Sequence, residues 1–195
     1  IPTTEQLKKS QYRVNYFFKI CSPLKMDFPN TVFSPVVKQE GDISIREALL
    51  NAGLDEDEEF ITLHPGASKL ERSWHAERFG ILCQKIIKEN GMKIVLLGTQ
   101  SEEKLLNRIK SCCSPDKVKI IPEMNLRVLA GVLKKSRLFV GNDSGMMHLA
   151  AMVGTPIVAI FGPGSVSTTG PYIAPEKCEI LTENYSCSPC HQRFF

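Results

Sequence analysis

The chain has 195 residues, 43% of them hydrophobic and 23% charged, a composition typical of a protein that folds around a sizeable core. Its formal net charge of +3, from 24 basic and 21 acidic residues, is too balanced to indicate a nucleic-acid-binding protein. No apolar run approaches the roughly 20 residues that cross a bilayer, and the polar first residues exclude a signal peptide, so we expect no transmembrane segment.

The first part of the chain gives weak signals of structure. Residues 44–53 have the pattern of a short helix that is capped by Ser44 and followed by a glycine. The acidic run at 55–59 is most simply a solvated turn before a strand.

From residue 60 onward, short apolar runs alternate with segments of helical periodicity. The apolar runs predict strands at 60–64, 93–98, 118–121, 137–141, 156–162 and 178–182. The segments between them predict helices at 74–90, from Ser101, at 126–135 and from 144 to the glycine at 154. Near-continuous apolar strands that alternate with helices indicate an α/β fold with a parallel sheet covered on both faces.

The change from weak to regular structural signals at residue 60 also suggests how the chain is divided. We expect residues 60–195 to form one domain, and residues 1–59 to be an interdomain region or the remnant of an N-terminal domain. Because the chain starts without methionine and stops abruptly, it is expected to be a piece of a longer protein.

Polar or glycine-bearing loops follow five of the predicted strands. Their sequences are HPGASKLER, TQSEE, PEMN, NDSG and PGSVSTTGPY. In an open parallel sheet, ligands bind at the carboxyl ends of the strands, so these loops are expected to lie on one rim. Their convergence indicates a binding site more strongly than any single loop does.

The NDSG loop offers the start of a helix to a ligand. Asp143 or Ser144 is expected to cap this helix, and Gly145 in its first turn leaves the N-terminus open. The unpaired N–H groups and the partial positive charge there suit a phosphate. His148 lies one turn further on the same face and can reach a phosphate or a sugar hydroxyl. The alternatives are a capped helix with no ligand and a histidine packed between two layers; the neighbouring loops favour the site.

The loop after the first predicted strand is a second candidate for phosphate binding. The segment that ends at Ala67 allows close approach of the backbone, and Ser68 offers a hydroxyl group. Lys69 or Arg72 offers positive charge. The alternative is a flexible basic loop that binds nothing.

Two further residues on the rim suit the rest of a nucleotide. The carboxylate of Glu102 can accept hydrogen bonds from ribose hydroxyls, although an acidic residue at the start of a helix is an equally good explanation. Met124 lies in a rim loop and can form an apolar wall against a base, although methionine more often belongs to a core. These residue types indicate a nucleotide-like ligand that carries phosphate.

Other motifs narrow the class of protein. The sequence has no GxGxxG after its first clear strand, no GxxxxGK[ST] and no GxSxG, which argues against a dehydrogenase, a P-loop NTPase and an α/β-hydrolase. Its seven cysteines, odd in number and irregularly spaced, suit buried thiols in a reducing compartment. Cys187 and Cys190 have metal-ligand or redox spacing, but only His191 lies nearby as a third ligand, which favours a structural role or a truncated motif.

The motifs also resemble a known family as a set. HPGAS followed by RSWHAERF, then LLGTQSEE, IPEMNL and FVGNDSGMMHLAAMVGTPIVAIFGP are similar, in this order and spacing, to the C-terminal domain of the family 9 glycosyltransferases, the ADP-heptose:lipopolysaccharide heptosyltransferases. The resemblance covers residues 60–172 well and residues 1–59 only loosely. The terminal CSPC resembles the cysteine-containing tail of heptosyltransferase II-like members.

This resemblance implies a GT-B architecture, in which two Rossmann-like domains enclose the active site. The domain seen here would bind the donor ADP-heptose, and the other domain would bind a lipid-linked oligosaccharide acceptor at the inner membrane surface. The reaction would be inverting transfer of heptose to the lipopolysaccharide inner core, with no cofactor or metal. The family's catalytic base, an aspartate near the start of the N-terminal domain, is missing here, so we expect donor binding without transfer. The implied location is the cytoplasm or the inner face of the bacterial inner membrane.

The resemblance also assigns roles to individual residues. Ser68 and Arg72 would hold the diphosphate, Glu102 the ribose, the Met124 loop the adenine, and Asp143 the heptose. The complete donor-binding set is Ala67, Ser68, Arg72, Glu102, Met124, Asp143, Ser144, Gly145 and His148. Arg72 departs from the family, which usually has lysine two residues before the tryptophan; the charge is kept, but the planar guanidinium and the compact ammonium are not equivalent. The alternatives left open are a non-catalytic nucleotide-binding module, a relative that uses another nucleotide sugar, and a redox or zinc protein built on CSPC.

Overall fold

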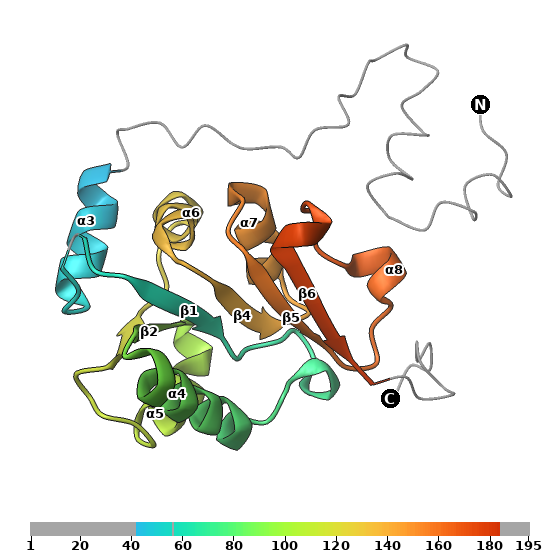
Figure 1. Ribbon diagram of the computed structural model, residues 1–195, viewed down its shortest axis with the longest axis horizontal. Coiled ribbons are helices and arrows are strands. Elements are labelled where there is room, and N and C mark those ends of the chain that lie inside the picture. Colours follow the sequence, from blue (N-terminus) through green and yellow to red (C-terminus); the bar gives the residue numbers. More distant parts are fainter. Residues whose placement is uncertain (1–41, 56, 184–195) are drawn as a thin grey trace, which may run out of the picture.

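The computed structural model describes residues 42–55 and 57–183. They form a six-stranded sheet in which all neighbouring strands are parallel, in the order β3-β2-β1-β4-β5-β6 (Figure 1). The strands are β1 (Phe60–His64), β2 (Lys93–Leu97), β3 (Val118–Ile121), β4 (Phe139–Asn142), β5 (Ile157–Phe161) and β6 (Cys178–Thr182). The predicted α/β fold with a parallel sheet is therefore confirmed.

Helices cover both faces of this sheet. One face carries α3 (Asp42–Asn51), α6 (Leu126–Lys135) and α7 (Gly145–Val153), and the other carries α4 (Ala76–Asn90) and α5 (Glu103–Lys110) (Figure 1). The remaining described helical segments are α8 (Val166–Thr169) and the 3-10 turns η3 (Leu70–Arg72), η4 (Gln100–Glu102) and η5 (Pro175–Lys177).

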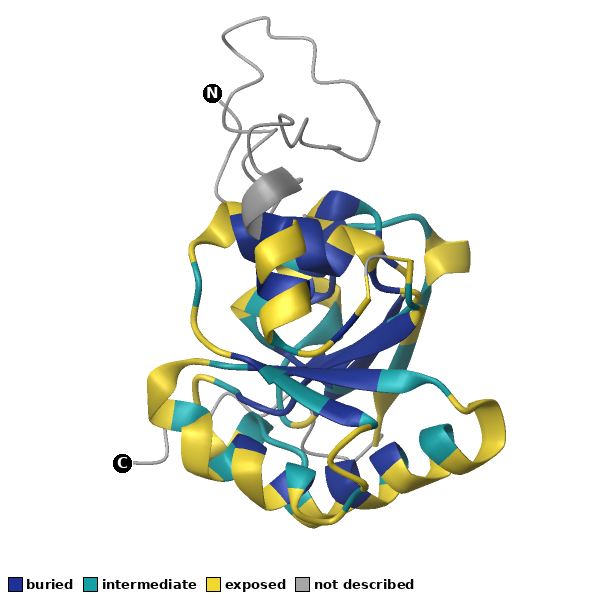
Figure 2. Ribbon diagram, turned by 90° about the vertical axis from the view of Figure 1, so that its left-hand side faces the viewer, coloured by how far each residue is buried: buried dark blue, intermediate teal, exposed yellow. Residues whose placement is uncertain are grey.

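The strands divide their side chains between two hydrophobic cores. Phe60, Val95 and Phe139 belong to the core under α3, α6 and α7, whereas Ile61 and Ile94 belong to the core under α4 and α5. This division follows from the strand geometry, because successive side chains point to opposite faces of a sheet. Figure 2 shows the buried strands between helices that expose their outer sides.

The boundaries of β1, β3, α6 and β6 agree with the predicted ones, but three helix starts differ. Helix α3 already includes Asp42, so the prediction that Ser44 caps it is wrong. Helix α4 begins at Ala76 rather than at Trp74, because the backbone is still extended at His75, its N-cap residue.

The helix predicted to begin at Ser101 is entered differently. Thr99 forms a capping box with Glu102, in which Oε2 of Glu102 accepts a hydrogen bond from the Thr99 backbone N–H at 2.8 Å. A 3-10 turn follows, and α5 begins only at Glu103. The prediction that this helix begins at Ser101 is therefore wrong, since the hydroxyl two residues earlier forms the reciprocal pair.

The strand order places a topological switch point at the centre of the sheet. From β1 the chain proceeds through β2 to β3 at one edge, and from β4 through β5 to β6 at the other. The connections after β1 and β4 therefore leave in opposite directions, and a crevice forms between their carboxyl ends.

Helix α3 contributes to the core although it precedes residue 60. Ile45 and Leu49 are buried in the same cluster as Val132 and Leu133 of α6. Gly131 lies at this contact, where a β-carbon would overlap the side chain of Ile45. The domain boundary at residue 59 stays a prediction, but the 42–54 segment packs on the domain that follows it.

Replacing Gly131 with alanine should test this packing. The added methyl group has no room beside Ile45, so we expect the free energy of unfolding to fall by about 1–3 kcal/mol in urea denaturation. Ile45→Ala removes the obstructing atoms but leaves a cavity of its own. The double variant should therefore be more stable than the sum of the two single effects predicts. Strict additivity would contradict the contact between α3 and α6.

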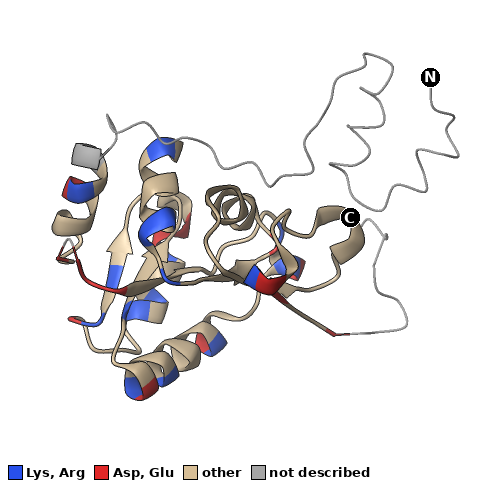
Figure 3. Cartoon of the chain, turned by 45° about the horizontal axis from the view of Figure 1, so that its top comes forward, with Lys and Arg blue, Asp and Glu red and all other residues tan. Residues whose placement is uncertain are grey.

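The face that carries α4 and α5 is open over β4, β5 and β6. A groove of about 1110 Å³ lies there, and its lining includes Val140, Val158, Ile160 and Ile180 of the strands. Charged residues lie on α3, α4, α5 and α6, those of α6 all basic, whereas α7 carries none (Figure 3). Among the described helices, none is long and apolar enough to cross a membrane.

Candidate functional site

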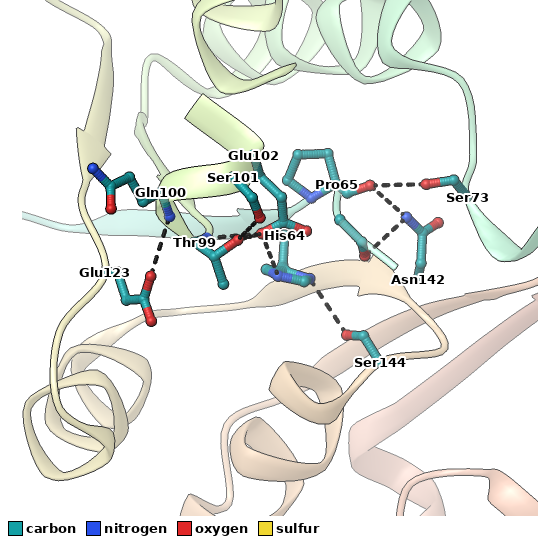
Figure 4. Close-up of polar contacts among 11 residues, drawn as sticks. His64, Pro65, Ser73, Thr99, Gln100, Ser101, Glu102, Glu123, Asn142 and Ser144 are labelled. Carbon is teal, nitrogen blue, oxygen red and sulfur yellow. Dashed lines mark hydrogen bonds and ion pairs between the residues drawn. The ribbon is translucent and has the colours of Figure 1, made fainter. Parts of the chain in front are cut away.

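Asn142, the last residue of β4, fastens the loop that follows β1 (Figure 4). Its buried side chain donates from Nδ2 to the carbonyl oxygen of Pro65 at 2.7 Å. Its Oδ1 accepts a hydrogen bond from the backbone N–H of Trp74 at 3.0 Å. The hydroxyl of Ser73 donates to the same Pro65 oxygen at 3.3 Å. Both ends of the 65–74 loop are thus held against the carboxyl end of β4.

His64, the last residue of β1, lies between the β2 loop and the start of α7 (Figure 4). Its Nδ1 is 3.4 Å from the hydroxyl oxygen of Ser144, and its Nε2 is 3.8 Å from Oε2 of Glu102. Burial lowers the pKa of His64 below its ordinary value, although the Glu102 carboxylate and the backbone of Gly66 act in the opposite direction. The ring is therefore neutral at pH 7.

Arg72 and Asp143 form an ion pair that joins the β1 loop to the β4 loop. Nη1 of Arg72 is 3.1 Å from Oδ2 of Asp143, whose side chain is only 5% exposed. The contact lacks hydrogen-bond geometry, and Oδ2 accepts no hydrogen bond from any described residue. A β-carbon at Gly164 in the β5 loop would come within 2.7 Å of this oxygen. Asp143 thus offers a buried acceptor that has a positive charge beside it and lacks a donor.

The N-terminus of α7 is open to solvent. Ser144 is the N-cap residue, but its side chain makes no capping hydrogen bond to the helix. A β-carbon built on Gly145 meets no other atom within 4 Å, so the space in front of the first turn is free. His148, one turn along the helix, is an exposed residue whose ring is partly covered. This partial burial lowers the pKa of the ring, and the Asp143 carboxylate opposes the shift. An anion can approach this helix end directly.

Glu102 has a structural role. Its Oε2 accepts hydrogen bonds from the backbone N–H and the hydroxyl of Thr99, at 2.8 and 3.0 Å. Its other carboxylate oxygen lies against Gly66, where any β-carbon would overlap it. The alternative expectation of an acidic residue at a helix start is thus confirmed, and a role in ribose binding stays a prediction.

A cavity of about 660 Å³ lies beside these residues, at the carboxyl ends of β2 and β3. Its walls combine polar and apolar groups: Gly98, Thr99, Gln100, Glu103, Leu106, Asn107, Ile120, Pro122 and Glu123. The volume falls within the roughly 300–1,000 Å³ of small-molecule sites. Met124 follows this lining in sequence and packs partly against the core under α6 and α7.

The structure therefore brings only some of the predicted site residues into contact. Arg72 and Asp143 are in contact, and Ser144 is connected to Glu102 through His64. Ala67 is half-buried and Ser68 exposed in the β1 loop, and neither side chain makes a hydrogen bond or ion pair with another described residue.

Metal and thiol chemistry gain no support from the described part of the chain. No three His, Cys, Asp or Glu residues there are grouped so that they could hold a metal ion. Burial raises the pKa of Cys83 to about 12, so its thiol stays protonated. Cys187, Cys190 and His191 lie outside the described residues.

Two residues that organise the site, His64 and Asn142, were not among the predicted site residues. Each is a polar residue at the carboxyl end of a buried strand, a position that faces the binding rim. That position is the signal in the sequence that could have identified them.

These features together define a class of protein. A doubly wound parallel sheet has an open helix N-terminus, a buried carboxylate paired with arginine, and a nucleoside-sized cavity, all at the carboxyl ends of its strands. This arrangement is that of a Rossmann-like domain, a fold that binds its ligands at such a switch point.

Comparison with known proteins identifies the family. The sequence matches the family Glycosyltransferase family 9 (heptosyltransferase) over residues 5–194, and the chain belongs to this family. It is 30% identical over 135 residues to lipooligosaccharide heptosyltransferase 2 of Campylobacter jejuni, a match that covers 67% of this chain and 42% of that protein.

Solved structures support the same fold. The family 9 glycosyl transferase from Veillonella parvula superposes with a TM-score of 0.80 at 24% identity, over 91% of this chain and 52% of that one. The E. coli heptosyltransferase WaaC, solved with ADP, superposes with a TM-score of 0.67 at 21% identity, over 89% of this chain and 51% of that one. The chain thus spans about half the length of these relatives, and its fold is that of the corresponding half of a heptosyltransferase.

Proposed function

We propose that this chain is the donor-binding part of a glycosyltransferase and that its ligand is ADP-heptose. The observation that carries the proposal is the open N-terminus of α7 at the switch point of the sheet, beside Arg72 and Asp143. A helix N-terminus and a guanidinium together suit a diphosphate. The E. coli relative WaaC was solved with ADP, which supports the choice of nucleotide.

The parts of the donor can be assigned along the rim. The diphosphate would lie at Ser144, Gly145 and His148, with Arg72 and the 67–68 segment on its other side. The adenosine would occupy the 660 Å³ cavity, with Glu102 and Met124 at its border. The heptose would donate a hydroxyl hydrogen bond to Asp143, whose buried Oδ2 lacks a donor.

The proposed chemistry needs no cofactor from this chain. When heptose leaves the donor, negative charge builds up on ADP. The α7 N-terminus and Arg72 would stabilise this charge without reorganisation, which is the largest contribution that such a site makes to a rate. For a full-length protein that contains this domain we propose inverting transfer of heptose to a lipid-linked acceptor of the lipopolysaccharide inner core, at the inner face of the membrane, with the catalytic base supplied by an N-terminal domain.

Calorimetric titration of the full chain with ADP, UDP and GDP tests the choice of donor. We expect ADP to bind at least about tenfold more tightly than the other two, a difference of about 1.4 kcal/mol. A preference for UDP or GDP would contradict the heptose donor and leave the fold unaffected. Absence of binding by all three would reject the donor-binding function.

Replacing Gly145 with alanine should separate ligand binding from stability. The methyl group meets no protein atom, so the melting temperature is expected to stay unchanged or rise slightly. It would occupy the space in front of the helix N-terminus, so we expect the dissociation constant of ADP to rise by about tenfold or more.

Gly91→Ala is the matched control. Its β-carbon also meets no atom within 4 Å, but the φ of +67° there is strained for alanine. This variant should lose about 1 kcal/mol of stability and bind ADP normally. Unchanged ADP binding by Gly145→Ala would show that the diphosphate does not lie at α7.

A further inference from the structure

The hydroxyl of Ser144 and Nδ1 of His64 share one hydrogen atom in the free site. Nε2 of His64 faces Oε2 of Glu102, which Thr99 holds in place with two hydrogen bonds (Figure 4). A carboxylate only accepts, so we assign the proton of the neutral ring to Nε2, the nitrogen that faces Glu102. The unprotonated Nδ1 then accepts, and the Ser144 hydroxyl donates its single hydrogen to it across 3.4 Å.

A phosphate at the N-terminus of α7 changes this requirement. Phosphate oxygens are acceptors, so the Ser144 hydroxyl can bind one only by donating its hydrogen to it. That hydrogen is then lost to His64 Nδ1, and two acceptors, Nδ1 and Oγ, face each other in a partly buried position. Leaving such a pair unsatisfied costs roughly as much as a hydrogen bond to phosphate contributes.

A proton on Nδ1 resolves the conflict. We propose that occupation of the phosphate site is coupled to the uptake of one proton from solvent by His64, so that Nδ1 donates to Ser144 and Ser144 donates to the phosphate. The imidazolium then carries its second N–H towards Glu102, and its charge lies between the carboxylate and the bound diphosphate. This inference rests on the proposed diphosphate site and specifies the protonation state in which that site holds its ligand.

Several charged groups face the His64 ring or the ligand position beside it. In the free protein, burial keeps the pKa of His64 low despite the charge of Glu102 and the contact with the Gly66 backbone. Two other titratable groups flank the ligand position, Asp143, which is paired with Arg72, and His148. A diphosphate adds negative charge beside both histidines, so the roles of His64 and His148 must be separated by experiment.

Proton linkage sets the direction in which ligand affinity should change with pH. If binding raises the pKa of His64, the complex binds more protons than the free protein in the interval between the two pKa values. Affinity is therefore highest below this interval, falls as the pH rises through it, and levels off above it.

The test uses ADP-ribose, because both phosphates of this sugar diphosphate keep a constant charge around neutral pH. Titrations of the full chain at pH 7 in buffers of different ionisation enthalpy give the number of protons taken up. We expect between about 0.3 and 1 proton per ligand, and an affinity that falls at least about threefold from pH 6.5 to pH 8. In NMR spectra at pH 7, the His64 ring should shift from neutral to protonated when ADP-ribose is added.

Variants identify the group that takes up the proton. The amide of His64→Asn can donate to Ser144 without gaining a proton, so this variant should bind ADP-ribose with no proton uptake and no dependence on pH. His75→Asn, the same change at an exposed histidine, should behave as the wild type. His148→Asn should keep the uptake. Uptake that persists in His64→Asn, or that disappears only in His148→Asn, would overturn the assignment to His64.

These measurements distinguish a failure of the proton coupling from a failure of the diphosphate site. If ADP-ribose binds without proton uptake and without a change of the His64 ring, the coupling is wrong and the diphosphate site stands. If ADP-ribose does not bind at all, the proposed function fails and the coupling fails with it. The NMR measurement on the wild type decides the question even if His64→Asn does not fold.

Discussion

Replacing Asn142 with alanine is expected to lower the free energy of unfolding by about 2–4 kcal/mol. The side chain is fully buried and satisfies the carbonyl of Pro65 and the N–H of Trp74. Alanine leaves the Trp74 N–H without this partner and the Pro65 carbonyl with only the longer bond from Ser73, and each such loss costs about 1–3 kcal/mol. Urea denaturation can follow the change through the fluorescence of Trp74, the one tryptophan of the chain.

Asn125→Ala provides the control for this measurement. Asn125 is also a hydrogen-bonding asparagine, but it is exposed and only caps α6, with Oδ1 accepting from the N–H of Val128 at 3.0 Å. Loss of such a cap costs about 1 kcal/mol. Equal effects of the two substitutions would mean that Asn142 does not fasten the β1 loop. Because that loop carries Arg72, the Asn142 variant should also bind ADP more weakly.

The fold was predictable because its central strands are buried on both faces. Runs such as FITLH and KIVLL are too apolar to lie at a surface, and the apolar stripe of LRVLAGVLKK has to be buried against other elements. The helix starts were less predictable, because several residues in the 99–103 segment can serve as caps. Thr99 was selected by a reciprocal bond with Glu102.

The candidate site was predictable in its position but not in its pairing. Loops at the carboxyl ends of parallel strands must share a rim, so the NDSG loop and the β1 loop were expected to lie together. The sequence does not show which side chains meet, because that depends on rotamers and on the distance between loops. The ion pair of Arg72 with Asp143 and the contact of His64 with Ser144 both join residues more than seventy positions apart, and neither was expected.

Glu102 illustrates the limit of assigning a role from residue type. A carboxylate at the mouth of a strand suits both a ribose and the N–H groups of a helix start. In the structure its Oε2 is already bonded to Thr99 and close to His64. A ribose hydroxyl would have to share this oxygen or the one that lies against Gly66. The sequence could not distinguish a free carboxylate from an occupied one.

Replacing Arg72 with methionine should weaken ADP binding by about 10- to 100-fold in calorimetric titration. A charge-assisted hydrogen bond to phosphate contributes about 1.5–3 kcal/mol, and methionine keeps the apolar bulk of the side chain without the charge. The same change leaves Asp143 without its cation. Because the Arg72 side chain is 34% exposed and water can reach the pair, the expected loss of stability is limited to about 1–3 kcal/mol.

The two effects of Arg72 can be separated with Asp143→Asn. In the Arg72→Met background this change removes the unpaired carboxylate, so stability should return towards that of the wild type. ADP affinity should stay low, because the diphosphate still lacks its cation, and Arg72→Lys, which keeps the charge, should lose less than about tenfold. If the double variant binds ADP as the wild type does, Arg72 acts only by neutralising Asp143. If it stays stable and fails to bind, Arg72 contacts the diphosphate.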